Sequence, residues 1–222
     1  DQDADVRISA AKALAHNGDP AVIVPLTLLL KDGDAQVRQE ASAALARLQG
    51  DEVGTQLLHL LSDENRSVRL QAVRLLGERK ATNAAAPMLK LLADNPEAEF
   101  CEELVRALGQ IAPTDAAAPL CEMLIDARTP PEVRLQAAFA LGATVRASAG
   151  EVDADEAPQD LPDPLAALTR ALADEDERLC FAALHSLVQI GGARASEALI
   201  DILQQEIPED AIEPTNGDLG GE

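Results

Sequence analysis

One ten-residue pattern recurs six times along this chain and constrains its fold more than any other feature. In its third copy the pattern reads VRLQAVRLLG, and the intervals between the copies are 31, 31, 32, 33 and 46 residues. Within each copy the apolar residues recur at helical spacing, and alanine occupies positions where a neighbouring helix must come close. Each copy therefore predicts one amphipathic helix. The six copies begin at Val6, Val37, Val68, Phe100, Val133 and Leu179.

A second helical segment follows the first in every copy. Its six versions, among them LTLLLKD, LLHLLSD and MLKLLAD, superpose without a gap, and five of the six end in aspartate. Pro25, Pro87 and Pro119 stand just before three of them, which fits an early helical position where a missing N–H costs little. Helix pairs at a fixed period indicate a solenoid, because no single pair can bury its apolar face alone. We therefore expect an all-α superhelix of about six helix pairs.

The spacing also predicts where the repeats divide. The fifth copy carries an acidic insertion, predicted as a surface loop at 148–163, and the segment 207–222 is predicted to be a disordered acidic tail, because it has little to bury. We expect one solenoid over residues 1–206, with repeats near 3–32, 33–63, 64–94, 95–126, 127–174 and 175–206.

The order of Asp, a short turn, Val-Arg, Ala and Leu-Gly, followed by an Ala/Leu-rich helix that ends in Asp, resembles HEAT repeats. Among these it is most similar to the short bacterial HEAT-like type also found in phycobilisome lyases. The resemblance extends from residue 1 to about 206. Cys101 and Cys180 depart from it because they stand where the pattern has Arg, and Val188 replaces the Gly or Ala after the helix-end Leu. The resemblance implies a solenoid whose second helices line its concave face.

The Asp and Arg residues of the pattern are interpreted as structural. Asp32 stands six residues before Arg38, and Asp63 stands six before Arg69. This spacing places a carboxylate at the end of one repeat beside a guanidinium that opens the next. We expect these pairs to cap helix ends and tie neighbouring repeats together, not to catalyse a reaction.

Charge and composition exclude several classes of function. The net charge is −21, but fourteen of the 39 acidic residues lie in 151–163 and 195–222, where no base occurs, so the rest of the chain carries only −7. Without a basic groove or aromatic stacking platforms, the chain does not favour nucleic-acid binding. No apolar run reaches the ~18 residues of a transmembrane helix, so we expect no membrane insertion. Three cysteines without close spacing indicate a reducing, cytoplasmic location.

Signals of catalysis are weak. His16, His59 and His185 fall in different repeats, and none precedes a Glu, so the His-Glu pairs of HEAT-like metal-dependent hydroxylases are absent. The acidic residues of the segment GEVDADEAPQD resemble those of a calcium-binding loop, but the segment lacks the glycine and the terminal glutamate at the required offsets. We therefore expect a non-enzymatic protein with no catalytic residue, no metal site and no cofactor.

The surface of the second helices is the remaining candidate site. The middle residue of each second segment should point away from the core, and this row runs from apolar through basic to acidic. Such a row is either an ordinary solvated face or a protein-binding groove, and we favour the groove, with the loop at 148–163 as the next candidate. The row comprises Leu28, His59, Lys90, Glu122, Arg170 and Asp201.

Two hypotheses of function follow. The first is a scaffold or adaptor that binds a protein partner through the concave face and the acidic loop. The alternative, implied by the resemblance, is a chaperone-like lyase or assembly factor that loads a tetrapyrrole-type cofactor onto a client protein. We also expect further repeats or another domain upstream, because Asp1 stands six residues before Arg7, in the register where a preceding second helix would close.

Overall fold

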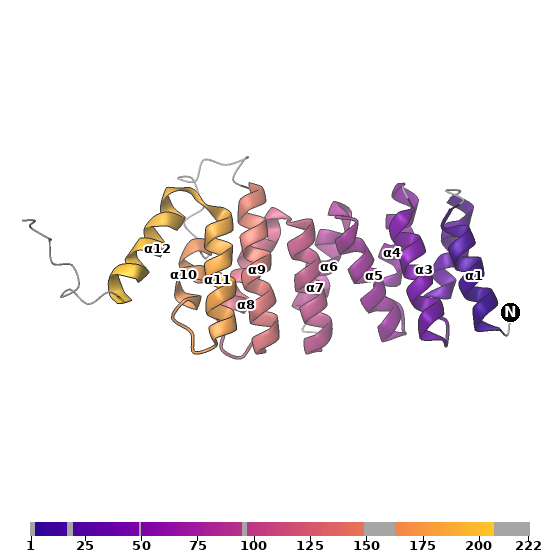
Figure 1. The fold of residues 1–222 in the computed structure, drawn as a ribbon, viewed down its shortest axis with the longest axis horizontal. Coiled ribbons are helices and arrows are strands. Elements are labelled where there is room, and N and C mark those ends of the chain that lie inside the picture. The colour runs from indigo at the N-terminus through magenta and orange to yellow at the C-terminus, as the bar shows by residue number, and fades with distance from the viewer. Residues whose placement is uncertain (1–2, 17–19, 49, 95–96, 149–162, 207–222) are drawn as a thin grey trace, which may run out of the picture.

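The computed structural model describes residues 3–16, 20–48, 50–94, 97–148 and 163–206, and in this part of the chain it contains twelve α-helices and no strand. The helices form six consecutive pairs stacked along one axis (Figure 1). The predicted all-α solenoid is therefore confirmed.

One helix of every pair begins with or just before a copy of the ten-residue pattern, and each predicted repeat contains one pair. These first helices are α1 (Ala4–Leu14), α3 (Ala35–Arg47), α5 (Arg66–Glu78), α7 (Ala98–Ile111), α9 (Pro131–Ser148) and α11 (Glu177–Ile190). The second helices are α2 (Ile23–Leu29), α4 (Asp51–Leu60), α6 (Ala85–Ala93), α8 (Ala117–Ile125), α10 (Pro164–Ala171) and α12 (Gly192–Glu206). Most of the predicted acidic loop, 149–162, and the predicted tail, 207–222, lie outside the described residues.

The helices form two layers. Figure 1 shows the first helices side by side, with most of the second helices behind them. Consecutive first helices pack on one another, and each first helix from α3 onward packs on the second helix of the preceding repeat, as α9 does on α7 and on α8. Neighbours in the stack are therefore also neighbours in the sequence, as a solenoid requires.

Side-chain caps fix where several helices begin. Asp34 accepts hydrogen bonds from the backbone N–H groups of Gln36 and Val37, and Asn65 accepts one from Ser67. Asp3, Asp163 and Asp176 cap their helices in the same way. A cap of this kind stabilises a helix by about 1 kcal/mol. The turn between repeats therefore specifies the start of the next first helix.

The core repeats with the chain. In the first five repeats the second helix has a fully buried leucine or methionine, and in the last five repeats the leucine at the ninth position of the pattern is fully buried. All of them belong to one cluster that runs from the first repeat to the last. These residues are Leu26, Leu57, Met88, Leu120 and Leu168 in the second helices and Leu45, Leu76, Leu108, Leu141 and Leu187 in the first.

The glycine of the pattern is a packing requirement. A Cβ atom on Gly77 would lie 2.9 Å from the Cα atom of Ala107, and one on Gly109 would lie 2.8 Å from the Cα atom of Ala140. A Cβ atom on Gly142 would lie 2.6 Å from the Cβ atom of Ser186. Only glycine lets the next first helix approach so closely, because real Cβ atoms do not tolerate these distances.

Candidate functional site

Five members of the predicted row are exposed. Leu28 on α2, His59 on α4, Lys90 on α6, Glu122 on α8 and Arg170 on α10 all present their side chains to solvent. We call these five residues the central row. Each stands two positions after the buried leucine or methionine of its helix, which turns it away from the core. The sixth predicted member, Asp201, lies in α12, outside the residues whose side chains the structure describes.

The charged side chains of the central row are available to a ligand. Among the residues that the structure describes, the side chains of Lys90, Glu122 and Arg170 take part in no ion pair or hydrogen bond. Many other charged groups are engaged, as Lys31 is with Asp63 at 2.5 Å between Nζ and Oδ2. The row therefore offers two cations and one anion that a partner can pair without breaking an internal contact.

The apolar end of the row is wider than the sequence indicated. Leu28 is 63% exposed, and Val24, one turn earlier on α2, is 52% exposed. The two side chains share one helix face because they are four residues apart. This face is an apolar surface of the kind that partner proteins cover.

A hollow of about 310 Å³ lies beside Arg170, between α8 and α10. Its lining combines apolar and charged side chains, among them Ile125, Arg134 and Asp174. The volume is at the lower limit of ordinary small-molecule sites, which measure about 300–1,000 Å³. The hollow suits one side chain of a partner better than a whole cofactor.

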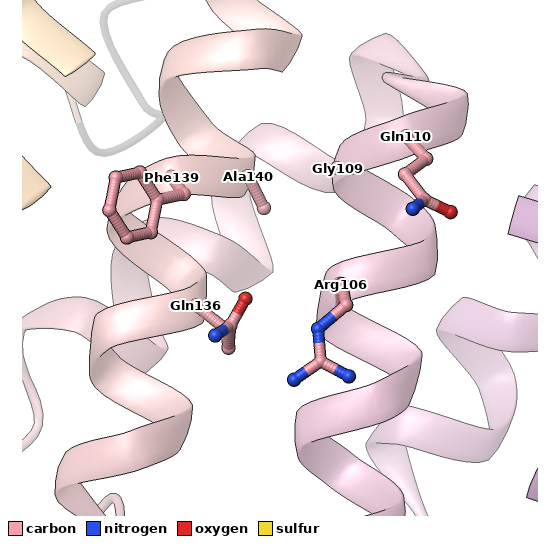
Figure 2. Close-up of a pocket in the computed structure, with 6 residues that line it drawn as sticks. All are labelled: Arg106, Gly109, Gln110, Gln136, Phe139 and Ala140. Carbon is pink, nitrogen blue, oxygen red and sulfur yellow. The ribbon is translucent and has the colours of Figure 1, made fainter. Parts of the chain in front are cut away.

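A second hollow, of about 210 Å³, lies on the first-helix side between α7 and α9 (Figure 2). Arg106 and Gln136 come from its two facing helices, and Gly109 and Ala140 mark where those helices approach most closely. Arg106 is already paired with Glu102 and Glu103. This hollow is smaller than ordinary ligand sites and its cation is engaged, so we do not assign a function to it.

The arginines at the start of a repeat bind the backbone of the preceding aspartate, whereas the sequence predicted a contact with its carboxylate. Arg38 does lie against Asp32, but its Nη1 donates to the Asp32 backbone carbonyl at 2.8 Å. Arg69 donates in the same way to the carbonyl of Asp63, also at 2.8 Å. The Asp32 carboxylate is bound instead by Arg7 of its own repeat, at 2.7 Å from Nε to Oδ2 and 2.9 Å from Nη2 to Oδ1. Two arginines from consecutive repeats thus share one aspartate, one on its side chain and one on its backbone.

The fifth repeat keeps this arrangement, and the sixth modifies it. Arg134 donates to the Asp174 carboxylate at 2.6 Å and to the carbonyl of Leu124 at 3.1 Å. Cys180 stands where the next arginine belongs, and its Sγ lies 3.1 Å from the Asp174 carbonyl. The Cys180 thiol therefore occupies the place of the arginine beside this carbonyl, but its hydrogen bond is weaker, because a thiol is a weak donor.

These contacts lower the pKa of the repeat aspartates. The Arg7 guanidinium, followed by the backbone N–H of Asp34, lowers the pKa of Asp32 below its usual 3.8. The Lys31 ammonium has the same effect on the pKa of Asp63. A carboxyl with a depressed folded-state pKa stabilises the protein above its unfolded pKa, and that stability is lost as the pH falls through the folded value.

We therefore expect acid to loosen the turns between repeats. The free energy of unfolding should fall between about pH 5 and about pH 2, and D32N should reduce this fall, because its amide keeps an acceptor for the Asp34 N–H without the carboxylate charge. Urea unfolding at several pH values measures both effects. D115N is the control, since exposed Asp115 has no ion-pair partner in the described part of the chain. An unchanged pH dependence in D32N would contradict the assignment.

Two of the three cysteines are not placed for nucleophilic chemistry. Cys101 and Cys121 are buried, and burial raises the pKa of both thiols, that of Cys121 to about 11. A thiol with so high a pKa is protonated at neutral pH and is a poor nucleophile. In addition, the residues that the structure describes contain no group of three or more His, Cys, Asp or Glu side chains that could hold a metal ion.

Sequence reasoning missed one cluster on the first-helix side. The His185 ring lies edge-on to Phe139, with centroids 5.6 Å apart, and 6.4 Å from the ring of Phe181. His185 is exposed, as are Lys12 and Arg74 in the same position of their copies. The signal that could have revealed the cluster is the alignment of copies, because Phe139 and His185 both occupy the seventh position of the pattern.

The class of protein is now defined. The HEAT-repeat family model matches residues 1–65, 54–142 and 125–213, which together span almost the whole chain. The chain belongs to the HEAT-repeat family. None of the curated proteins matches it. No helix in the described ranges combines the length and the apolar character needed to cross a membrane.

Solved structures share this fold. The complex of CpcE and CpcF of phycocyanin lyase from Nostoc is similar with a TM-score of 0.53 and 23% identity, over 96% of this chain and 87% of that chain. An engineered protein is similar with a TM-score of 0.53 and 22% identity, over 87% of this chain and 95% of that chain. The resemblance to phycobilisome-lyase repeats is thus confirmed at the level of the fold.

Proposed function

We propose that this protein is a non-enzymatic scaffold that binds a protein partner through the central row. The observation that carries the proposal is that Lys90, Glu122 and Arg170 are exposed and form no ion pair with any described residue, whereas many charged groups elsewhere are paired. Two cations, on α6 and α10, in the same row as an apolar face at Val24 and Leu28 on α2, fit a segment that carries both acidic and apolar side chains. The hollow beside Arg170 receives one of its side chains.

The cofactor-loading alternative receives less support. Such a factor needs an apolar pocket for the cofactor or a reactive nucleophile, whereas the two hollows described above measure about 210 and 310 Å³ and the two buried thiols have raised pKa values. The similarity to the CpcE and CpcF complex concerns the fold alone at 23% identity. We therefore favour protein binding without a catalytic step.

The test is charge reversal in the central row. In affinity capture from the source cells, K90E/R170E should retain at least about tenfold less of the bound partner, because two cations become anions on an otherwise unchanged surface. Its melting temperature should stay near that of the native chain, since surface substitutions usually change stability by less than about 0.5 kcal/mol.

The matched control is R47E/R128E, which adds the same negative charge at two exposed arginines outside the central row that form no ion pair with any described residue. It should retain the partner as the native chain does. Equal capture by K90E/R170E and the native chain would show that the central row is not the binding surface, and equal loss in both double variants would reduce the effect to net charge.

A further inference from the structure

The charges of the central row alternate in sign along the stack. Lys90 on α6, Glu122 on α8 and Arg170 on α10 hold the same position of three consecutive second helices, two residues after the buried methionine or leucine of each. All three side chains are exposed. The surface of these helices therefore presents a cation, an anion and a cation in order. We call Lys90, Glu122 and Arg170 the charge triplet.

Opposite charges of neighbouring repeats pair with each other on the first helices but not in the charge triplet. On the first helices, Lys12 Nζ lies 3.4 Å from Glu40 Oε1, and Arg74 Nε lies 3.2 Å from Glu103 Oε1. Within the part of the chain that the structure describes, no ion pair joins one member of the triplet to another. A molecule that lies across α6, α8 and α10 can therefore pair all three charges at once.

The step between repeats sets the spacing of the triplet. Consecutive first helices pack directly on one another, and packed helices lie about 8–10 Å apart. The second helices belong to the same repeats, so neighbouring members of the triplet are about 10 Å apart along the stack. A polyproline II segment has three residues per turn and a rise of about 3.1 Å per residue. Its side chains at every third position therefore share one face at intervals of about 9 Å.

We infer that the charge triplet binds a polyproline II segment of the partner in which every third residue is charged, in the order acidic, basic, acidic. The inference rests on the proposed function, because it specifies the segment that the central row takes. Each charged side chain of the segment meets the opposite charge on one second helix. The hollow beside Arg170 favours glutamate at that end, since Ile125 and Ala173 in its lining can cover the aliphatic part of the side chain.

A helical partner segment fits this surface less well. An amphipathic helix binds through apolar side chains that are three, four and seven residues apart, and it needs an apolar groove to receive them. Of the large apolar residues that α6, α8 and α10 contain, only Ile125 is exposed in the described ranges. A polyproline II segment is ordered before it binds, so it loses little conformational entropy and depends less on burying a broad apolar face.

NMR titration of the ¹⁵N-labelled protein with synthetic peptides tests this inference, at low ionic strength so that salt does not screen the exposed charges. The peptide EPPKPPE should shift the amide signals of α6, α8 and α10. It should bind at least about threefold more tightly than EPKPPPE, in which the lysine is displaced by one residue and loses its ion pair. Both peptides have the same composition, so the net charge of −21 on the protein affects them equally.

Reversal of the charge triplet should reverse the preference. K90E/E122K/R170E changes three exposed residues, so it should fold as the native chain does. It should bind KPPEPPK more tightly than KPEPPPK by a similar factor, and it should no longer distinguish EPPKPPE from EPKPPPE. The control R47E/E64K/R128E makes the same changes at exposed residues outside the central row and should keep the native preference.

Several results would overturn the inference. They are equal affinities of the native chain for EPPKPPE and EPKPPPE, no binding of either peptide at millimolar concentration, shifts confined to the first helices, and an unchanged preference in K90E/E122K/R170E. Tighter binding of an alanine-rich helical peptide with the same charges seven residues apart would assign the triplet to a helical partner instead. If the peptides are not distinguished but K90E/R170E still loses the captured partner, this inference fails and the proposed function stands. If the peptides are distinguished but K90E/R170E retains the partner, only the proposed function fails.

Discussion

Replacing Gly142 by valine should lower the free energy of unfolding by about 2–3 kcal/mol, one of the two largest single effects that we expect in this protein. Even the first added carbon would lie 2.6 Å from the Cβ atom of Ser186, so α9 and α11 must separate. Separation would also strain the bond from the Ser186 hydroxyl to the carbonyl of Ala138, now 2.9 Å long. Urea unfolding followed by circular dichroism measures the loss.

The control is a helical glycine without a close neighbour. Nothing lies within 4 Å of a Cβ atom built on Gly54 in α4. G54A should therefore stabilise the protein by about 0.5–1 kcal/mol, the usual gain of alanine over glycine in a helix. We therefore expect the free energy of unfolding to fall in G142V and to rise in G54A. If G54A lost as much as G142V, the close approach of the next helix would not be the reason for the glycine at position 142.

The second large effect concerns the core. L108A should cost about 3–4 kcal/mol, because Leu108 is fully buried in α7 in the middle of the stack and its truncation leaves a cavity. L28A, which removes the same atoms from an exposed site, should cost less than about 0.5 kcal/mol. Thermal unfolding of both variants measures these two losses of stability. Similar losses in L108A and L28A would mean that Leu28 is covered in solution.

The repeated part of the fold could be predicted from the sequence, because the spacing of its apolar residues follows directly from which residues are buried. The spacing of the copies predicts one helix pair per repeat, and the register within each copy predicts which residues face solvent. The five residues of the central row are exposed for this reason. His185 and Lys12, which both hold the seventh position of their copies, are exposed for the same reason.

Contacts that depend on distant partners could not be predicted in this way. The spacing from Asp32 to Arg38 indicates proximity, but it does not say which oxygen the guanidinium binds. The Asp32 carboxylate is captured by Arg7, which lies 25 residues earlier in the sequence. The contact between Phe139 and His185 likewise joins two repeats separated by a long insertion. The spacing of residues within a repeat does not predict either of these two contacts.

Gly77, Gly109 and Gly142 each contact the first helix of the following repeat, so the contacts between repeats run in one direction along the chain. This has a consequence for synthesis on the ribosome. At each of these contacts the glycine belongs to the earlier repeat, and the residue that covers it belongs to the later one, as Ala107 covers Gly77. A nascent chain emerges from its amino end, so every newly made repeat waits with an open face until its successor has been translated. We expect the protein to fold stepwise during translation, each helix pair serving as the template on which the next one assembles.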